Sequence, residues 1–387
     1  MANPISPPPQ SPSSSSCSSK RRKLSHNNQP QALIPGLPDH LAQVCLSLVH
    51  PSFLYSVCRS WRRLIYSSSF PPFLSLYAIL STTNPSPPSE IRTRTQQQQP
   101  QVHFRSFDPI SSAWQALPSP PTEPPHRLLL RHPCFISRNL PIQTVSVSGE
   151  LVLLAATSDN FVPALPRPLI FNPLSKTWKF GPNFSAPRRW CAAGALRGSV
   201  YVASGIGTHY SIDVARSAER LDLKNSWEWE RLSGLRDGRF SRDAIEAVGW
   251  RGKLCMVNVK GSSAKNGVVY NMEADVWEDM PDGMIAGWRG PVAAMDEEEM
   301  FVVDERDGAL RKYDTVRDCW IRIMESDRLI GAVQMVAGGG RVCAVSAGGG
   351  EIVVVDVAVS PASLWVVDIP SGLQAVAVHI LPRMTRP

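Results

Sequence analysis

The stretch Val268-Val269-Tyr270-Asn271-Met272-Glu273-Ala274-Asp275-Val276-Trp277-Glu278-Asp279 has an extended apolar run, a polar turn and a second short run. Asn and Asp side chains hydrogen-bond their own backbone in turns, so Asn271 through Asp275 suits a reversal of the chain. The stretch therefore predicts a β-hairpin in which Trp277 anchors the returning strand.

The same pattern recurs six times along the 387 residues. The copies are Phe107-Asp108 with Trp114, Phe171-Asn172 with Trp178, Leu221-Asp222 with Trp229, Tyr270-Asn271 with Trp277, Tyr313-Asp314 with Trp320 and Val355-Asp356 with Trp365. A further hairpin precedes such a copy, for example around the turn Arg197-Gly198. A period of roughly 40 to 50 residues built from short strands is typical of a propeller blade.

These residues resemble kelch repeats, in which an apolar strand ends in paired glycines and is followed by Tyr-Asp and Trp at this spacing. The glycine pairs are reduced here, as in Ser204-Gly205-Ile206-Gly207. Six tryptophan hairpins predict a mainly β fold with a six-bladed kelch-type propeller over residues 71–387. Residues 73–80 are expected to supply an inner strand of the first blade, and residues 374–381 to complete that blade, which removes an open edge. Unrelated β-sandwiches are the alternative.

Residues 33–70 predict a small helical unit. Apolar residues at positions 41, 45 and 48, and again at 54, 57, 61, 64 and 65, follow helical spacing. Pro51 suits the first turn of a second helix. A segment this short cannot bury a core alone, so we expect it to need a partner.

This segment resembles an F-box, whose Leu-Pro-x-Asp start matches Leu37-Pro38-Asp39 and whose centre matches Val57-Cys58-Arg59-Ser60-Trp61-Arg62. The resemblance implies the substrate receptor of an SCF-type (Skp-cullin-F-box) ubiquitin ligase, which binds a Skp-type adaptor and, through it, cullin. The residues implied for the adaptor-facing and core positions of the adaptor-binding unit are Leu37, Pro38, Leu41, Leu54, Val57 and Trp61. An ordinary helical cap packed on the propeller is the alternative.

The remaining composition separates tails and insertions from the folded parts. Residues 1–32 are rich in Pro, Ser, Gln and Asn, which predicts a disordered tail. Residues 84–101 and the segment between Pro118 and Pro133 predict flexible insertions. The cluster Lys20-Arg21-Arg22-Lys23 is a candidate nuclear import signal, so we expect a nuclear or cytoplasmic location and no membrane span.

The net charge of +7 comes from the N-terminal part of the chain. Residues 1–101 hold nine Lys and Arg against two Asp and Glu, whereas residues 102–387 hold 31 of each. A basic tail does not make the propeller a nucleic-acid binder, so no direct nucleic-acid contact is expected.

The common sequence motifs of catalytic and metal-binding sites are absent from the chain. The sequence has no His-Glu-x-x-His, no phosphate loop and no Gly-x-Ser-x-Gly elbow. The eight cysteines lack the spacing of a zinc site, and we expect reduced thiols. We therefore expect no catalytic residues, no metal and no cofactor.

The segments that cross from one blade to the next are the candidate surface for a protein target. They carry Arg and Trp, which are frequent in interface hot spots. The residues are Arg188, Arg189, Trp190, Arg239, Arg242, Trp288, Arg289 and Arg328. The same placement also suits packing between blades with hydrogen bonds to backbone carbonyls. A kelch scaffold that assembles partners without ubiquitin is the second functional hypothesis, and a propeller enzyme is a remote third.

Overall fold

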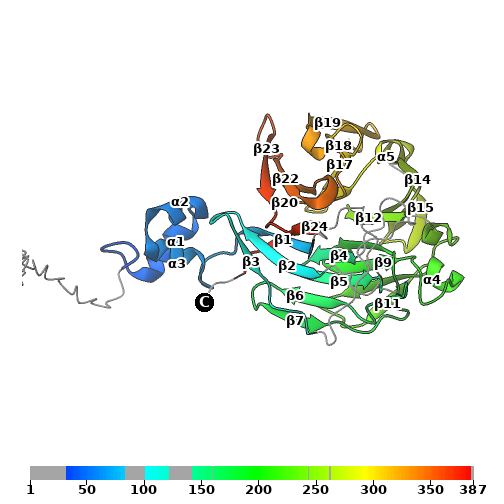
Figure 1. The fold of residues 1–387 in the computed structure, drawn as a ribbon, viewed down its shortest axis with the longest axis horizontal. Helices are drawn as coiled ribbons and strands as arrows, with labels where there is room; N and C mark the ends of the chain where they lie inside the picture. The colour runs from blue at the N-terminus through cyan, green and yellow to red at the C-terminus, as the bar shows by residue number, and fades with distance from the viewer. Residues whose placement is uncertain are drawn as a thin grey trace, which may run out of the picture.

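The computed structural model describes residues 32–82, 101–121, 142–158, 160–242, 244–260 and 263–384. Within these ranges the chain forms a small helical unit beside a ring of six β-sheets (Figure 1). Nearly all of the predicted tail 1–32, including its basic cluster, and most of the two predicted insertions lie outside the described residues.

Each of the six sheets has four antiparallel strands, which confirms the predicted six-bladed propeller. Blade 1 consists of β24 (Leu373–Pro382), β1 (Leu74–Thr82), β2 (Val102–Asp108) and β3 (Ala113–Ala116). Blade 2 consists of β4 (Ile142–Val147), β5 (Glu150–Ala156), β6 (Leu169–Asn172) and β7 (Thr177–Phe180). Blade 3 consists of β8 (Ala192–Leu196), β9 (Ser199–Ala203), β10 (Ala218–Asp222) and β11 (Trp229–Leu232).

The second half of the ring repeats this arrangement. Blade 4 consists of β12 (Ala244–Trp250), β13 (Lys253–Lys260), β14 (Ser263–Asn271) and β15 (Val276–Asp279). Blade 5 consists of β16 (Val292–Met295), β17 (Glu299–Asp304), β18 (Ala309–Asp314) and β19 (Cys319–Glu325). Blade 6 consists of β20 (Gln334–Gly338), β21 (Arg341–Val345), β22 (Glu351–Asp356) and β23 (Ser363–Asp368). Short helices interrupt the segments between strands: α4 (Ile212–Arg216), α5 (Asp282–Gly287), η1 (Arg239–Arg242), η2 (Asp327–Leu329) and η3 (Ala347–Gly349).

The ring closes in blade 1, where the C-terminal strand β24 pairs with β1. The sequence predicted this closure, but it also predicted that residues 73–80 supply an inner strand. In the structure β24 lies next to the axis, and β1 is the second strand of the blade. The Tyr77 hydroxyl donates a hydrogen bond to the Pro382 carbonyl at 2.7 Å. Both long edges of β1 are therefore paired.

The turns between the first and second strands of a blade follow the sequence expectation. Arg197 and Gly198 both have positive φ, 47° and 76°, and so do Arg251 and Gly252, at 48° and 72°. Two successive residues with positive φ make the turn whose twist matches a β-hairpin, and glycine adopts this conformation without strain.

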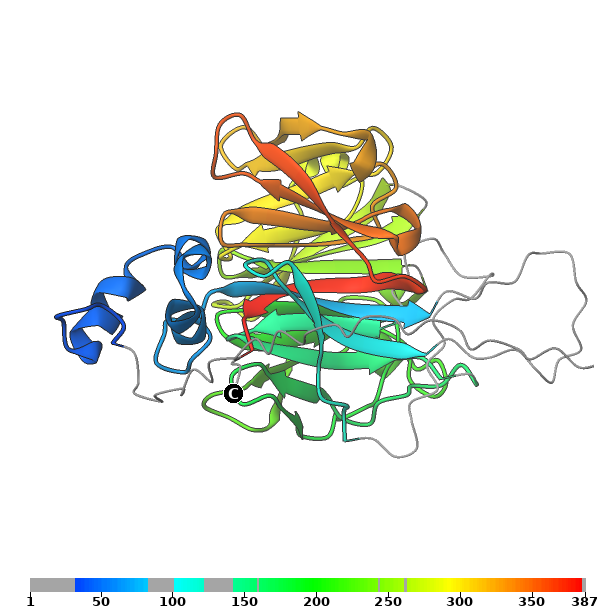
Figure 2. The same ribbon diagram turned by 60° about the vertical axis from the view of Figure 1, so that its left-hand side comes forward.

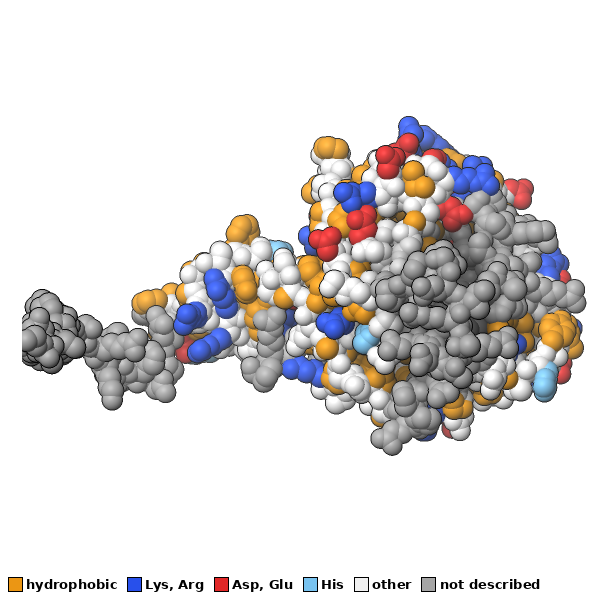
Figure 3. Space-filling model, viewed as in Figure 1, with side chains coloured by type: hydrophobic (Ala, Val, Ile, Leu, Met, Phe, Trp, Pro, Cys, Tyr) orange, Lys and Arg blue, Asp and Glu red, His pale blue; other side chains and the backbone are white. Residues whose placement is uncertain are grey.

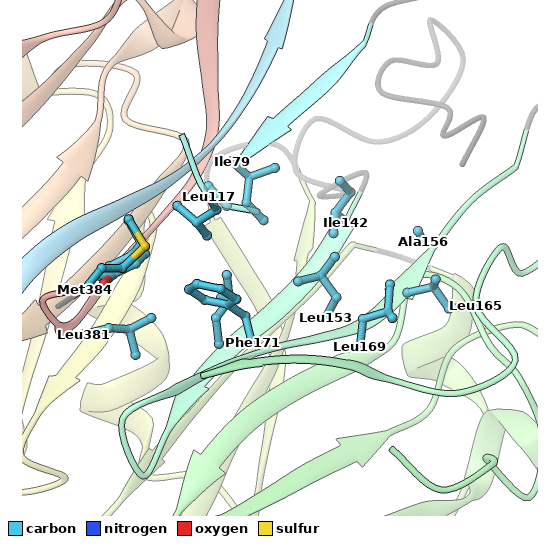
Figure 4. Close-up of a cluster of buried hydrophobic side chains, with 13 residues drawn as sticks. Ile79, Leu117, Ile142, Leu153, Ala156, Leu165, Leu169, Phe171, Leu381 and Met384 are labelled. Atoms are coloured by element: carbon cyan, nitrogen blue, oxygen red, sulfur yellow. The ribbon is translucent and has the colours of Figure 1, made fainter. Parts of the chain in front are cut away.

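The hydrophobic core is divided among the seams between neighbouring blades. In the seam between blades 1 and 2, Ile79 of β1 and Phe171 of β6 belong to one buried cluster with Leu381 and Met384 from the C-terminal segment (Figure 4). Similar clusters join each of the remaining five pairs of neighbouring blades. Each blade therefore depends on its two neighbours for burial.

The six repeated tryptophans lie in the outermost strands, as predicted. Five of their indole N–H groups donate to a backbone carbonyl at the end of the preceding blade. The pairs are Trp114 with Asp368 at 2.9 Å, Trp178 with Pro118 at 2.7 Å, Trp229 with Pro182 at 3.2 Å, Trp277 with Ser233 at 2.8 Å and Trp320 with Met284 at 3.0 Å. The tryptophans thus join blades as well as anchoring strands.

The helical unit contains α1 (Asp39–Ser47), α2 (Pro51–Val57) and α3 (Arg59–Ile65). Pro51 begins α2, as expected. The predicted second helix is divided, because Cys58 is extended, with φ −154°. The Arg62 guanidinium donates from Nε to the Tyr55 carbonyl at 2.5 Å, which satisfies a backbone acceptor near this break.

The helical unit and the crossing segments lie on opposite sides of the ring. The helical unit leads into the start of β1, which pairs with the end of the inner strand β24. The crossing segments enter the inner strands at their other ends, away from the helices (Figure 2). No helix within the described ranges is both long enough and apolar enough to cross a membrane.

Candidate functional site

Helix α1 turns one apolar side toward the interior of the helical unit and another toward solvent. Ala42 and Leu46 are buried, whereas Leu41, Val44 and Leu48 are exposed. The exposed residues are three and four positions apart, so they lie along one face of the helix. Leu48 has an exposed fraction of 85%. A helix that is apolar on its solvent side indicates a missing partner.

Helix α2 and the residue before it continue this exposure, with Val49, Phe53 and Val57 all open to solvent. We call the six residues Leu41, Val44, Leu48, Val49, Phe53 and Val57 the apolar stripe. Figure 3 shows hydrophobic side chains at the surface of the helical unit. Exposed apolar groups gathered in this way mark interaction sites.

The predicted adaptor residues divide between this surface and the core of the helical unit. Pro38, Leu41 and Val57 are exposed, and Leu37 is half-buried. Leu54 is fully buried, and the Trp61 indole donates to the Leu33 carbonyl at 2.8 Å. Leu54 and Trp61 are core positions that hold the unit together in this structure, and the Leu54 side chain does not reach solvent.

Four residues of the apolar stripe were missing from the predicted adaptor residues: Val44, Leu48, Val49 and Phe53. Helical spacing in the sequence does not say which of two apolar faces is covered. The signal that was available is the excess of apolar residues, since α1 has more of them than its inward face can bury.

On the far side of the ring, Arg188 is an interior residue. Its guanidinium lies 3.3 Å from the Glu219 carboxylate, and the two side chains are 1% and 2% exposed. Arg188 also donates to the Ser204 carbonyl at 3.2 Å and to the Ser217 hydroxyl at 2.9 Å. The prediction that Arg188 contacts a target is therefore wrong, and the packing alternative holds for it.

Trp288 and Arg189 are also mainly structural. Trp288 is 1% exposed within the seam between blades 4 and 5, and its indole donates to the Glu246 carboxylate at 3.0 Å. Arg189 is buried, donates to the Gly207 carbonyl at 2.9 Å and stacks over the Trp190 ring. Burial lowers the pKa of the Arg189 guanidinium. Trp288 is thus corrected from a target contact to a core residue.

Three predicted target residues are exposed, and each has an acidic neighbour. The ion pairs are Arg239 with Asp237 at 2.6 Å, Arg289 with Asp304 at 4.0 Å and Arg328 with Glu351 at 2.9 Å. Hydrogen bonds from Arg239 hold the pKa of Asp237 below its usual value. The Arg242 side chain lies outside the described part of the structure.

A cavity of about 300 Å³ lies at the centre of the ring, lined by inner strands of the blades and by Trp190. His379 of β24 faces it and bonds the Thr144 hydroxyl at 2.8 Å. Burial lowers the pKa of His379 to about 4, which keeps its ring neutral near pH 7. The residues that the structure describes contain no cluster of three or more metal-ligating side chains.

The sequence of the chain is similar to the sequences of several plant proteins. No family model matches the chain. The chain is 50% identical to the F-box/kelch-repeat protein SKIP25 of Arabidopsis thaliana over 378 residues, which cover 95% of this chain and 93% of that protein. A second F-box/kelch-repeat protein of the same plant is 24% identical over 295 residues, 68% of each chain. The F-box protein AFR is 22% identical over 300 residues, 71% of this chain and 69% of that protein.

Proposed function

Because the chain belongs to the F-box/kelch-repeat family, we propose that it is the substrate-recognition subunit of an SCF-type ubiquitin ligase. The helical unit binds a Skp-type adaptor, and the propeller binds a protein target. The chain itself positions the target, while other subunits of the ligase carry out ubiquitin transfer.

The apolar stripe is the observation that carries this proposal. Its large side chains are exposed on helices that project from the ring, where the propeller does not cover them. Each Å² of apolar surface that is removed from water contributes about 25 cal/mol of favourable free energy to binding. Burial of the stripe therefore favours binding of a partner. An ordinary helical cap would already have its apolar side chains buried against the ring and would have no such surface to offer.

The far side of the ring is the proposed target surface. Arg239, Arg289 and Arg328 are exposed there, and Trp190 is partly exposed at the central cavity. Guanidinium groups bind carboxylate and phosphate through charge-assisted hydrogen bonds, so an acidic or phosphorylated segment fits this surface. We propose that the complex acts in the nucleus or the cytoplasm, and the basic cluster at residues 20–23 supports nuclear import.

The test is binding of a purified Skp-type adaptor to the full chain, measured by calorimetry. Leu41→Asp combined with Phe53→Asp is expected to weaken binding at least about 100-fold, because both changes bury a charge in the interface. Both positions lie in the first turn of a helix, where an acidic side chain is compatible with the helix dipole.

The matched control is Val316→Asp, at an apolar residue of the propeller that is 92% exposed. It is expected to leave adaptor affinity unchanged, and the melting of the ring should be the same in all three proteins. Equal adaptor affinity in the double variant and the parent would overturn the proposal and favour an interaction scaffold without ubiquitin.

A further inference from the structure

Arg383 follows β24 directly, and its side chain reaches from the ring into the helical unit. Although charged, it is only 3% exposed. Its guanidinium donates to the carbonyls of Ile65, Tyr66 at 3.3 Å and Ser67 at 3.2 Å. One side chain just after the last strand of the propeller therefore binds the carbonyls of three successive residues at the end of the helical unit.

These acceptors lie at the C-terminal end of α3, where Ile65 is the last helical residue, Tyr66 is the C-cap and Ser67 follows it. The last carbonyls of a helix lack partners within the helix and carry partial negative charge. A guanidinium has several donors in a fixed plane and keeps its charge, so it can satisfy several such carbonyls at once. Arg383 thus caps α3 from outside its own segment.

Two aromatic rings enclose the same guanidinium. It lies 5.3 Å from the centre of the Tyr66 ring and 4.9 Å from the centre of the Phe73 ring, within the range of cation–π attraction. Tyr66 is the C-cap residue of α3, and Phe73 directly precedes β1. The backbone N–H of Arg383 also donates to the Phe73 carbonyl at 2.9 Å. The linker between the two units is therefore held at the same point.

Residues on both sides of Arg383 are fixed to the ring. The Pro382 carbonyl accepts the Tyr77 hydroxyl, and Met384 is buried in the seam between blades 1 and 2 (Figure 4). A second contact between the units joins the Tyr66 hydroxyl to the Asp108 carboxylate. The base of the Arg383 side chain cannot follow a movement of the helices, since its backbone is part of the propeller.

We propose that Arg383 is the positioning residue that fixes the orientation of the helical unit relative to the propeller. Neighbouring domains move relative to each other unless their interface is large or specifically held. Here a buried cation that belongs to the ring binds the helix end, next to the hydrogen bond between Tyr66 and Asp108. If the proposed function is correct, Arg383 also sets the direction in which a bound target faces the rest of the ligase.

The experiment measures the distance distribution between spin labels on the two units by double electron–electron resonance. One label is placed on Cys45, which is exposed on α1, and the other on Val316→Cys in the propeller. Cys17, Cys58, Cys134 and Cys319 are replaced by Ser. Cys191, Cys255 and Cys343 remain, because burial raises the pKa of their thiols to about 11, 12 and 12 and makes them unreactive.

In the full chain without adaptor, the parent should give one narrow distribution. Arg383→Gln is expected to broaden it at least about twofold, because the helix end loses its charged partner and the units become free to reorient. Arg383→Lys should give an intermediate width, since an ammonium keeps the charge but lacks the planar donors. The control Arg251→Gln, at an exposed arginine paired with Glu298, should match the parent.

Ring stability is measured in the same samples by thermal melting. Broadening in Arg383→Gln with an unchanged melting transition of the ring supports the proposal. An unbroadened distribution in that variant would overturn it. Loss of the propeller transition would also overturn it, because Arg383 would then be a residue for ring closure. Neither result depends on whether the chain binds an adaptor, so failure here is distinct from failure of the proposed function.

Discussion

At the scale of single residues, the pair Arg188 and Glu219 shows how a crossing segment is held to its blade. Taking two charges out of water is costly, and only their mutual attraction and further hydrogen bonds offset that cost. Arg188 has both kinds of partner, with Glu219 at 3.3 Å and the Ser217 hydroxyl at 2.9 Å. The ion pair therefore fixes the conformation of the crossing segment, and the Arg188 charge is not available to a binding partner.

Arg188→Ala is expected to lower the free energy of unfolding by about 3 to 5 kcal/mol, because it leaves the Glu219 carboxylate buried without its partner. Replacing both residues by Met should cost much less, since no charge is then left in the interior. Denaturant unfolding of the ring measures both effects. Arg197→Ala, which removes an exposed ion pair with Glu273, should change stability by at most about 1 kcal/mol. A small loss in Arg188→Ala, similar to that control, would contradict this role.

At the scale of the element, the tryptophan hairpin is a connector between blades. In blade 4 the Tyr270 hydroxyl donates to Asp275, and Asp275 accepts the backbone N–H of Ser233 from the preceding crossing segment. Blade 5 repeats the arrangement with Tyr313, Asp318 and the N–H of Gly283. These hydrogen bonds hold the pKa of both carboxyls below the usual value. The acid that ends the turn thus serves the neighbouring blade as well as its own hairpin.

Trp277→Ala should destabilise the propeller by about 3 to 5 kcal/mol, because a large buried ring is replaced by a void. The change also removes the indole hydrogen bond to the Ser233 carbonyl. Trp365 is the matched control, since it occupies the equivalent outer strand of blade 6 but is 40% exposed. Its replacement by Ala should cost less than that of Trp277, because less apolar surface of the ring is buried. Equal melting temperatures for Trp277→Ala and the parent would show that the hairpin does not anchor the blade.

At the scale of the whole molecule, the repeats predicted the number of blades and the strand that closes the ring, because hairpin spacing and alternation are properties of the local chain. They did not separate Arg188 and Trp288, which are buried, from Arg239 and Arg328, which are exposed. All four lie in crossing segments, 8 to 11 residues after the tryptophan of the preceding outer strand, so this spacing does not distinguish them. Whether each side chain is buried depends on how the neighbouring blade packs against it. The spacing of residues along the chain does not reveal this packing.

The position of the proposed target surface can be tested by charge reversal on the two sides of the ring. Arg239→Glu with Arg328→Glu is expected to lower recovery of acidic or phosphorylated targets by about tenfold, because each change reverses a charge available to carboxylate or phosphate. Arg197→Glu with Arg251→Glu is the control on the side of the helical unit. All four arginines are about half exposed, and each is paired with an acid.

Recovery is quantified from one extract at two salt concentrations, together with binding of the Skp-type adaptor. Adaptor binding should be the same in both double variants. Equal target recovery in the two variants would show that the target surface lies elsewhere on the propeller.

The closure of blade 1 has a consequence for the order in which the molecule can form. Tyr77 and Pro382, which bond across that blade, are 305 residues apart in the chain. During synthesis β1 is made early and keeps an unpaired edge until β24 emerges. Contacts between distant segments form slowly, and an open edge can pair with the matching strand of another copy. A higher concentration of chains with open rings therefore favours pairing of β24 with β1 of another chain over pairing with β1 of its own chain.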